Sequence, residues 1–338
     1  MRPARFGLLF CLLAGALNAC TGDTLRVLFL GNSYTYGNDL PVLFAGLAQS
    51  AGKTALTDQN TPGGYTLAQH RADSVSLAKI ALGTFDYVVL QEQSQTPVIE
   101  YWRYNEMYPA CRSLDSLIRA AGASAAFFMT WGRKYGGTQT RGGYSSPPFI
   151  DYFEMQDSLR SSYTMIAQEL SATLVPAGMG WRLARLQDSL VDLWQSDYSH
   201  PTLKGSYLAA CVFYAKLFRA NPVGLSFTGG LTPEEALLCQ QFAWEAVNCV
   251  TEEAPLPKTA RPNLRVFPNP FSHATRLSCR PGDAVVIRDA LGRQVATVHT
   301  GSSGSVTWNA VDWSERPLPG GVYLATASQE TARLVLLR

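Results

Sequence analysis

The sequence lacks a hydrophobic run long enough to cross a membrane. Its longest apolar stretch, residues 6–17, falls well short of the roughly 20 residues that a membrane-spanning helix needs. An excess of one charge is also missing, because 28 Lys and Arg against 26 Asp and Glu leave a formal net charge of +2. No basic stripe with interleaved aromatic residues is present, so we expect no nucleic-acid partner.

Paired cysteine spacings are absent as well. The seven cysteines are scattered, without the close pairs of a zinc site or the regular spacing of a disulfide scaffold. Cys239 and Cys249 are predicted to share one helix, where their separation of about 15 Å is too large for a direct bridge. We therefore expect buried thiols with at most one disulfide, and the sequence implies no metal and no organic cofactor.

The first 20 residues have the layout of a secretory signal peptide. Two arginines lie among the first five residues, the apolar run 6–17 follows, and small residues close the segment before Cys20. We therefore expect an exported protein. Residues 17–20 (LNAC) also resemble a lipoprotein processing box, which would anchor the mature protein by a lipid on Cys20, and we favour simple cleavage over this alternative.

The composition of the remaining chain favours a large folded core. With 338 residues, of which 46% are hydrophobic and 11% aromatic, the chain is long enough for a full-sized domain and a second one. From residue 25, short apolar runs alternate with longer amphipathic stretches, which is typical of parallel strands joined by helices. The candidate strands are 25–30, 87–90, 124–129 and 172–175, and the candidate helices are 40–51, 66–82, 105–121, 152–170, 203–220 and 233–250. This pattern predicts a doubly wound α/β fold, a three-layer sandwich around a parallel sheet, over residues 24–251.

The composition and the hydrophobic pattern of the sequence change after residue 251. Residues 252–262 are rich in proline and charge and have no apolar period, which predicts an interdomain linker. Beyond them, short β-rich runs are separated by Gly, Pro and Asn, at 284–287, 295–298, 305–308 and 321–327. This spacing predicts a small all-β sandwich over residues 263–338.

Ser33 is the candidate nucleophile. It follows directly on the first predicted strand, and Gly31 permits a tight exit from that strand. Ligands of open α/β sheets bind at the carboxyl ends of the strands, so the hydroxyl of Ser33 is expected at that edge. A serine hydroxyl is a poor nucleophile alone and needs a histidine that takes its proton.

The choice of base is narrow, because the sequence has only four histidines, His70, His200, His273 and His299. The last two belong to the β-rich region. His200 has an aspartate three residues earlier and precedes Pro201, which holds the segment as a loop before the next helix. His70 has Asp73 nearby, but a pair three apart on one helix surface is common and usually inert. The pattern therefore favours His200.

Four sequence blocks together resemble those of a known family. They are residues 31–35 (GNSYT), 61–65 (TPGGY), 88–94 (VVLQEQS) and 197–201 (DYSHP). In this order they resemble the conserved blocks of SGNH/GDSL hydrolases, over about residues 24–250. The resemblance implies an SGNH/flavodoxin-like fold and a triad of Ser33 as nucleophile, His200 as base and Asp197 as the residue that orients the base. It also implies an oxyanion hole that includes the backbone amides of Ser33 and Gly64.

Two departures from the family pattern concern the same region. The first block reads Gly-Asn-Ser where Gly-Asp-Ser is usual, and the third block has no Gly-x-Asn-Asp. The family takes its third oxyanion donor from the missing Asn. A glutamine amide can donate in its place, so we expect either Gln91 or Gln93 to be that donor. Each block alone also has a structural interpretation, as a turn, a helix cap or a solvated strand end, and their joint order favours catalysis.

Arg133 and Lys134 follow the strand predicted at 124–129. They are either a contact for an acidic group of the substrate or, as is common for such a surface pair, only solvated.

The final 76 residues carry a second resemblance. Residues 266–271 (VFPNPF), 289–293 (DALGR), 318–323 (LPGGVY) and 333–338 (RLVLLR) resemble a type A sorting domain of type IX secretion. This implies the type IX machinery as a partner and transit across the outer membrane of a Gram-negative bacterium, which disfavours a lipid on Cys20. A carbohydrate-binding β module is the alternative.

The sequence thus predicts a secreted serine esterase that acts on small acyl esters, with acetyl groups on a polysaccharide or glycan as the leading candidates. One alternative is a lipase or thioesterase for longer acyl chains. The other is a non-catalytic glycan-binding surface protein on a degenerate hydrolase scaffold, for which the altered third block is the main argument.

Overall fold

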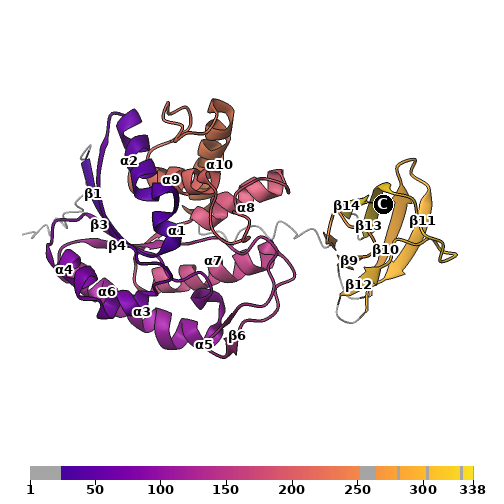
Figure 1. Cartoon of the computed structure of the whole chain (residues 1–338), viewed down its shortest axis with the longest axis horizontal. Helices are drawn as coiled ribbons and strands as arrows, with labels where there is room; N and C mark the ends of the chain where they lie inside the picture. Colours follow the sequence, from indigo (N-terminus) through magenta and orange to yellow (C-terminus); the bar gives the residue numbers. More distant parts are fainter. Residues whose placement is uncertain (1–23, 252–263, 280–281, 302–303, 328–329, 338) are drawn as a thin grey trace, which may run out of the picture.

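The computed structural model describes residues 24–251, 264–279, 282–301, 304–327 and 330–337. The predicted signal peptide (1–20) with Cys20 and the predicted linker (252–262) lie outside the described residues. Residues 24–251 form an α/β unit and the residues from 264 onward form a β-rich unit (Figure 1). No helix within the described ranges is long and apolar enough to span a membrane.

Five parallel strands form the central sheet of the first unit. Their order is β2-β1-β3-β4-β7, with β1 at Thr24–Leu30, β2 at Thr54–Asn60, β3 at Tyr87–Leu90, β4 at Ser124–Phe128 and β7 at Thr173–Val175. This is the flavodoxin-like order, which reverses between β1 and β3, and such a reversal opens a crevice at the carboxyl ends of the two strands. The predicted doubly wound α/β fold is confirmed.

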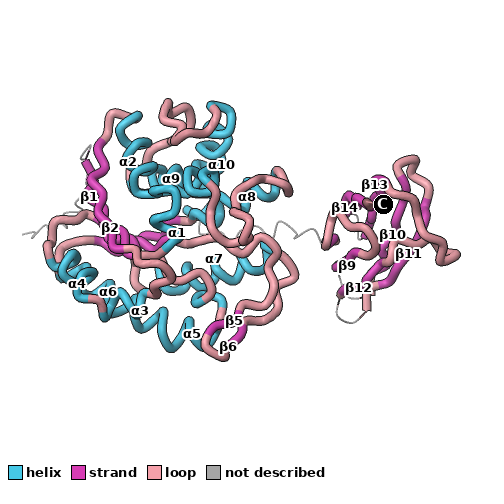
Figure 2. Tube along the Cα trace, viewed as in Figure 1, coloured by secondary structure: helices cyan, strands magenta, loops and turns pink. Residues whose placement is uncertain are grey.

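Helices cover both faces of this sheet (Figures 1 and 2). One face carries α2 (Leu40–Ser50), α8 (Ala177–Gln187), α9 (Leu203–Leu217) and α10 (Pro233–Thr251). The other carries α3 (Leu67–Ala72), α4 (Ser74–Ala81), α6 (Tyr108–Ala120) and α7 (Tyr152–Glu169). The short helices α1 (Ser33–Tyr36) and α5 (Glu100–Trp102) follow β1 and β3, and the small hairpin of β5 (Thr140–Arg141) and β6 (Tyr144–Ser145) follows β4.

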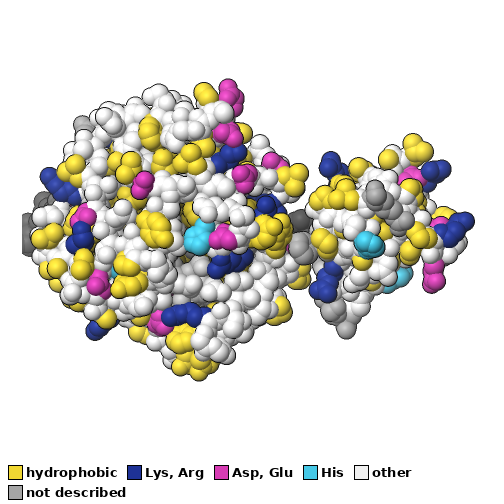
Figure 3. Space-filling view, in the orientation of Figure 1, with side chains coloured by type: hydrophobic (Ala, Val, Ile, Leu, Met, Phe, Trp, Pro, Cys, Tyr) yellow, Lys and Arg dark blue, Asp and Glu magenta, His cyan; other side chains and the backbone are white. Residues whose placement is uncertain are grey.

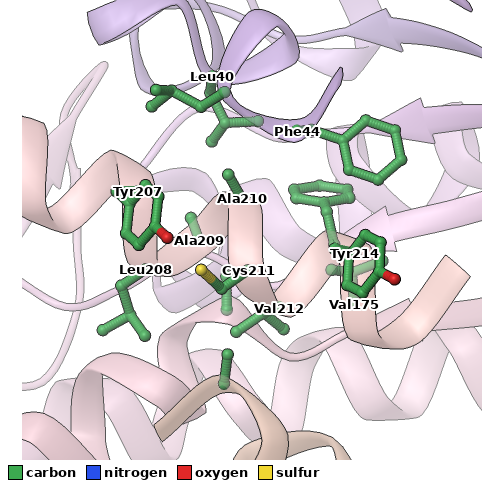
Figure 4. Close-up of a cluster of buried hydrophobic side chains, with 14 of the residues drawn as sticks. Leu40, Phe44, Val175, Tyr207, Leu208, Ala209, Ala210, Cys211, Val212 and Tyr214 are labelled. Carbon is green, nitrogen blue, oxygen red and sulfur yellow. The ribbon is translucent and has the colours of Figure 1, made fainter. Parts of the chain in front are cut away.

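Strand β1 shows why helices cover both faces of the parallel sheet. Val27 and Phe29 pack into the core on the α9 side, whereas Leu28 and Leu30 pack into the core on the α6 side. A strand buried on both faces reads as a continuous apolar run, which is why β1 was predictable. Helix α9 is buried along nearly its whole length, and its side chains fill the space between α2 and β7 (Figure 4).

Three features of this unit differ from the sequence-based expectation. Strand β2 was not predicted, because it is a polar edge strand (TALTDQN) without an apolar run. Helix α8 was not predicted either. The single helix expected at 66–82 is two helices, because Asp73 adopts an extended conformation and its carboxylate accepts from Ser76 N to cap α4.

The second unit consists of two antiparallel sheets. One has the order β11-β10-β13-β14 and the other β12-β9-β8. Their side chains share a separate buried cluster that includes Leu277, Ile287, Trp308 and Leu334. The small all-β architecture is confirmed. The strands are β8 (Arg265–Phe267), β9 (Thr275–Ser278), β10 (Ala284–Asp289), β11 (Gln294–His299), β12 (Ser305–Trp308), β13 (Gly321–Ala327) and β14 (Glu330–Leu336).

Candidate active site

Ser33 is the first residue of α1, directly beyond the carboxyl end of β1. Gly31 is required at the exit from the strand, because a Cβ there would come within 2.6 Å of the side chains of Thr35 and Gln91. Asn32 caps α1 by accepting from Tyr34 N at 3.2 Å. The tight exit and the cap together place the Ser33 hydroxyl at the edge of the sheet.

His200 and Asp197 lie on one tight turn that precedes α9. Tyr198, between them, adopts a left-handed conformation with φ of 60°. Asp197 Oδ1 accepts from the backbone amides of Ser199, at 3.0 Å, and His200, at 2.9 Å. The carboxylate therefore holds the turn that carries its own histidine.

The structure brings the three predicted triad residues together. His200 Nε2 lies 2.9 Å from Ser33 Oγ, and His200 Nδ1 contacts Asp197 Oδ2. Burial acts to raise the pKa of Asp197, but hydrogen bonds from His200 and from the two backbone amides lower it below its ordinary value. An ionised Asp197 favours the tautomer in which Nδ1 carries the proton, so Nε2 is free to accept from Ser33.

A series of aromatic rings packs against the ring of His200. The ring of Tyr34 lies 5.6 Å from that of His200 in an edge-to-face arrangement and stacks on Trp131, whose ring in turn stacks on Trp181. The Tyr34 hydroxyl is 2.7 Å from Ser199 Oγ. All three aromatic side chains are buried, so they form a platform for the turn that carries Asp197 and His200 and present no ring face to solvent.

The two candidate glutamines have different surroundings. Gln91 is fully buried, and both ends of its amide are occupied: Oε1 accepts from Asn32 N and Thr35 Oγ1, while Nε2 donates to Asn32 Oδ1 and Glu92 O. Gln93 is partly exposed and lines the same cavity as Ser33 and His200. Its Nε2 has only a 3.4 Å contact with Gln95 Oε1, so it retains donor capacity toward the cavity.

Gly64 lines the same cavity as Ser33 and His200. Its φ of 73° belongs to the left-handed region that favours glycine. This loop is joined to the nucleophile loop because Asn32 Nδ2 donates to Tyr65 O at 2.8 Å. Ser33, Gly64 and Gln93 all line the cavity.

Glu92 is a functional candidate that sequence reasoning missed. It is fully buried between the two glutamines and accepts from Gln93 N at 2.6 Å and Leu67 N at 3.3 Å. Burial raises its pKa to about 8. The carboxyl group thus connects the Gln93 loop to the start of α3, and its signal in the sequence was an acidic residue that directly follows a buried strand.

His70 lies outside the triad. It is fully buried, where its Nε2 donates to Gly31 O at 2.8 Å and its Nδ1 lies 2.8 Å from Ser76 Oγ. Burial lowers the pKa of His70 below its ordinary value. The residue therefore braces the nucleophile loop from behind, which its spacing to Asp73 in the sequence did not indicate.

The cavity beside Ser33 has a volume of about 350 Å³. It is lined by Asn32, Ser33, Tyr34, Tyr36, Gly63, Gly64, Gln93, Ser94, Arg133, Ser199 and His200. No aliphatic side chain is among them, and the lining combines polar groups with the rings of Tyr34 and Tyr36. Charged side chains of both signs are dispersed over the face of the protein shown in Figure 3.

Within the described ranges, no cluster of three or more His, Cys, Asp or Glu side chains could hold a metal ion. Cys111, Cys211 and Cys239 are free, buried thiols, as expected, whereas Cys279 is only half-buried.

Comparison with known proteins yields structural likenesses only. No family model matches the chain, and no curated protein matches it. A DUF4886 family protein from Bacteroides uniformis shares 19% sequence identity, over 67% of this chain and 95% of its own, with a TM-score of 0.53. A candidate SGNH hydrolase from Slackia heliotrinireducens shares 26% identity, over 57% of this chain and 99% of its own, with a TM-score of 0.46.

A third likeness is to PorZ, a surface component of the type IX secretion system of Porphyromonas gingivalis. It shares 23% identity over 22% of this chain and 11% of its own, with a TM-score of 0.20. The TM-scores of this match and of the Slackia protein are too low to establish a shared fold. The first unit of the chain therefore shares its doubly wound α/β fold with the DUF4886 family protein of Bacteroides uniformis.

Proposed function

We propose that the chain is an exported serine esterase that cleaves short acyl esters through an acyl-enzyme on Ser33. The observation that carries this proposal is the continuous set of contacts from Ser33 Oγ through His200 to Asp197 Oδ2. Ser33 and His200 are 167 residues apart in the chain, and both lie at the functional edge of the sheet. A nucleophile, a base and an orienting carboxylate in this order are the requirements of acyl transfer.

The reaction runs in two steps. His200 Nε2 takes the proton of Ser33 while Oγ attacks the ester carbonyl, and the protonated histidine then gives that proton to the departing alcohol. Water, deprotonated by the same histidine, then attacks the acyl-enzyme. The histidine returns this proton to Ser33 Oγ as the bond between Oγ and the acyl group breaks, which releases the acid and free Ser33. The backbone amides of Ser33 and Gly64 and the side-chain amide of Gln93 stabilise the oxyanion of both tetrahedral intermediates.

The cavity supports a short acyl group over a long one. Its volume of about 350 Å³ suits a small molecule, and its lining has no aliphatic side chain that would bury an alkyl chain. We therefore expect kcat/KM to be higher for p-nitrophenyl acetate than for p-nitrophenyl laurate. The reverse order would favour the lipase or thioesterase alternative.

Export and a carbohydrate-linked substrate belong to the same proposal. Export rests on the signal-like residues 1–20, and delivery by the type IX machinery rests on the motifs within 263–338. An exported esterase with a small cavity that lacks aliphatic side chains fits acetyl groups on polysaccharides or glycans. The non-catalytic alternative is disfavoured, because a degenerate site has no need to keep Ser33, His200 and Asp197 in contact.

A fluorophosphonate probe, which reacts with activated serine hydroxyls, tests the nucleophile. We expect it to label the wild-type protein and the control Ser145→Ala, whose serine is exposed on β6, and to leave Ser33→Ala unlabelled. Equal labelling of the wild type and Ser33→Ala would exclude the assignment.

A further inference from the structure

Arg133 is the feature of the cavity that the proposed reaction does not use. It lies in the loop beyond the carboxyl end of β4, and it lines the cavity together with Ser33 and His200. Arg133 and His200 are the basic residues of this lining, and no acidic residue belongs to it. A permanent positive charge therefore faces the space in which the ester must bind.

The main chain on both sides of Arg133 is fixed. Gly132 N donates to Gln156 Oε1 at 2.9 Å, and Gly132 O accepts from Trp194 Nε1 at 3.0 Å. On the other side, Lys134 N donates to Tyr198 O at 3.0 Å, within the turn that carries Asp197 and His200. Arg133 is thus held by the same framework as the triad, unlike an arginine on a loose surface loop.

The head group of Arg133 is only partly satisfied by the protein. A guanidinium has five N–H donors, and here Nη2 donates to Ser94 Oγ at 3.1 Å. Within the described part of the chain the side chain makes no other hydrogen bond and no ion pair, and no carboxylate lines the cavity. A half-buried cation without a counter-ion produces a local field that attracts an anion.

We infer that Arg133 binds a carboxylate of the substrate, so that the preferred substrate is an acyl ester that also carries a carboxylate group. This inference rests on the proposed esterase function and adds its substrate class. The planar fork of the guanidinium matches a carboxylate through paired, charge-assisted hydrogen bonds. The carboxylate belongs either to the alcohol part, as in an acetylated sugar acid, or to the acyl part, as in a half-ester of a dicarboxylic acid.

Two pairs of substrates distinguish these sources. Acetylated methyl glucuronoside against acetylated methyl glucoside places the charge on the alcohol, and p-nitrophenyl hemisuccinate against p-nitrophenyl acetate places it on the acyl group. We expect the wild type to prefer the charged member of one pair by about tenfold or more in kcat/KM, mainly through a lower KM. The preference should shrink as salt concentration rises.

Three variants assign that preference to one side chain. Arg133→Gln should reduce kcat/KM for the charged ester at least about tenfold more than for its neutral partner. Arg133→Lys should retain part of the preference, because it keeps the charge and loses the fork. Lys134→Gln is the matched control: its ammonium lies 5.8 and 5.7 Å from the rings of Tyr135 and Tyr198, outside the cavity lining, and the preference should persist.

The outcomes separate this inference from the proposed function. Two results would overturn the inference and leave the proposed esterase function intact. One is hydrolysis that depends on Ser33 but shows no preference for the charged ester. The other is an equal loss of kcat/KM on both esters in Arg133→Gln. If no ester is hydrolysed, calorimetry with glucuronate and succinate still tests the anion site. Binding that Arg133→Gln abolishes and Lys134→Gln preserves would support the site, and absence of binding to the wild type would refute it.

Discussion

At the scale of single residues, the side-chain amides of Asn32 and Gln91 hold the loop that carries Ser33. Asn32 donates to Tyr65 O through Nδ2 and accepts from Gln91 Nε2 through Oδ1. A carboxylate at position 32 would lose the donor and place two oxygens against each other. The two departures from the usual family pattern, Gly-Asn-Ser and a glutamine after β3, are therefore parts of one hydrogen-bonded arrangement.

Substitution of Gln93 tests whether its side-chain amide is the third oxyanion donor. Its Oε1 accepts from Gln95 N at 2.8 Å and Thr96 N at 3.2 Å, so Gln93→Glu keeps these acceptors and removes the amide donor. We expect kcat for p-nitrophenyl acetate to fall by roughly 100-fold with little change in thermal midpoint. Steady-state kinetics and thermal unfolding measure the two effects.

Gln91→Ala provides the contrast to this variant. It leaves the buried donors of Asn32 and Thr35 without their acceptor, so we expect a loss of roughly 1–3 kcal/mol in the free energy of unfolding. If Gln93→Glu retained the full kcat, or if Gln91→Ala lowered kcat without loss of stability, the choice of Gln93 as third donor would be wrong.

At the scale of secondary-structure elements, Glu92 joins the end of β3 to the start of α3. Its carboxyl contacts Gln93 N and Leu67 N, and the loop between Gly64 and α3 depends on the second of these contacts. His70 on α3 then reaches back to Gly31 O. Two elements that flank the nucleophile are thus held by single buried side chains, a carboxyl and an imidazole.

The pKa of Glu92 leads to a prediction on stability. Burial raises this pKa from its ordinary value of 4.5 to about 8, so between these pH values the folded state holds a proton that the unfolded chain releases. The free energy of unfolding should therefore fall as pH rises through this window. Glu92→Gln removes the titration, and its stability relative to the wild type should improve from pH 5 to pH 9 in urea unfolding.

Glu100→Gln is the control for this effect, because Glu100 is exposed at the start of α5. The improvement in relative stability from pH 5 to pH 9 should be larger for Glu92→Gln than for Glu100→Gln. If the stability of Glu92→Gln relative to the wild type did not change over this range, Glu92 would be ionised in the fold at neutral pH.

At the scale of the whole molecule, the hydrophobic clusters divide along the chain. Two clusters lie within residues 24–251, on the two faces of the parallel sheet, and the third is built only from residues beyond 263. No buried residue is shared between the first two clusters and the third. Each unit therefore buries its own apolar surface, which is the basis for independent folding.

This division predicts two unfolding transitions for the full protein. A chain that ends at residue 251 should retain the kcat of the full protein and its Ser33 labelling, and should lose one calorimetric transition. In a host with type IX secretion, the same truncation should leave active enzyme inside the outer membrane. A single cooperative transition, or loss of activity on truncation, would contradict the separation of the two units.

Much of the site could be predicted where its residues are local in sequence. Ser33 follows an apolar strand, and the spacing of Asp197 to His200 is three residues, so short-range patterns indicated both parts. The roles of Gln93, Glu92 and Arg133 depend on which side of a loop each side chain takes. No periodicity encodes this choice, because it follows from contacts with elements distant in the chain.

The sequence by itself determined the alternation of strands and helices, the doubly wound class, the β-rich second unit and the order of the blocks around the site. These features follow from apolar periodicity and from backbone preferences of Gly and Pro, which act over a few residues. Only the tertiary structure decided that a polar segment forms the edge strand β2, that Gln91 is buried while Gln93 faces the cavity, and that Arg133 lies beside Ser33. The physical reason is that burial and hydrogen-bond partners at these positions come from residues far away in the chain, so they exist only once the sheet has assembled.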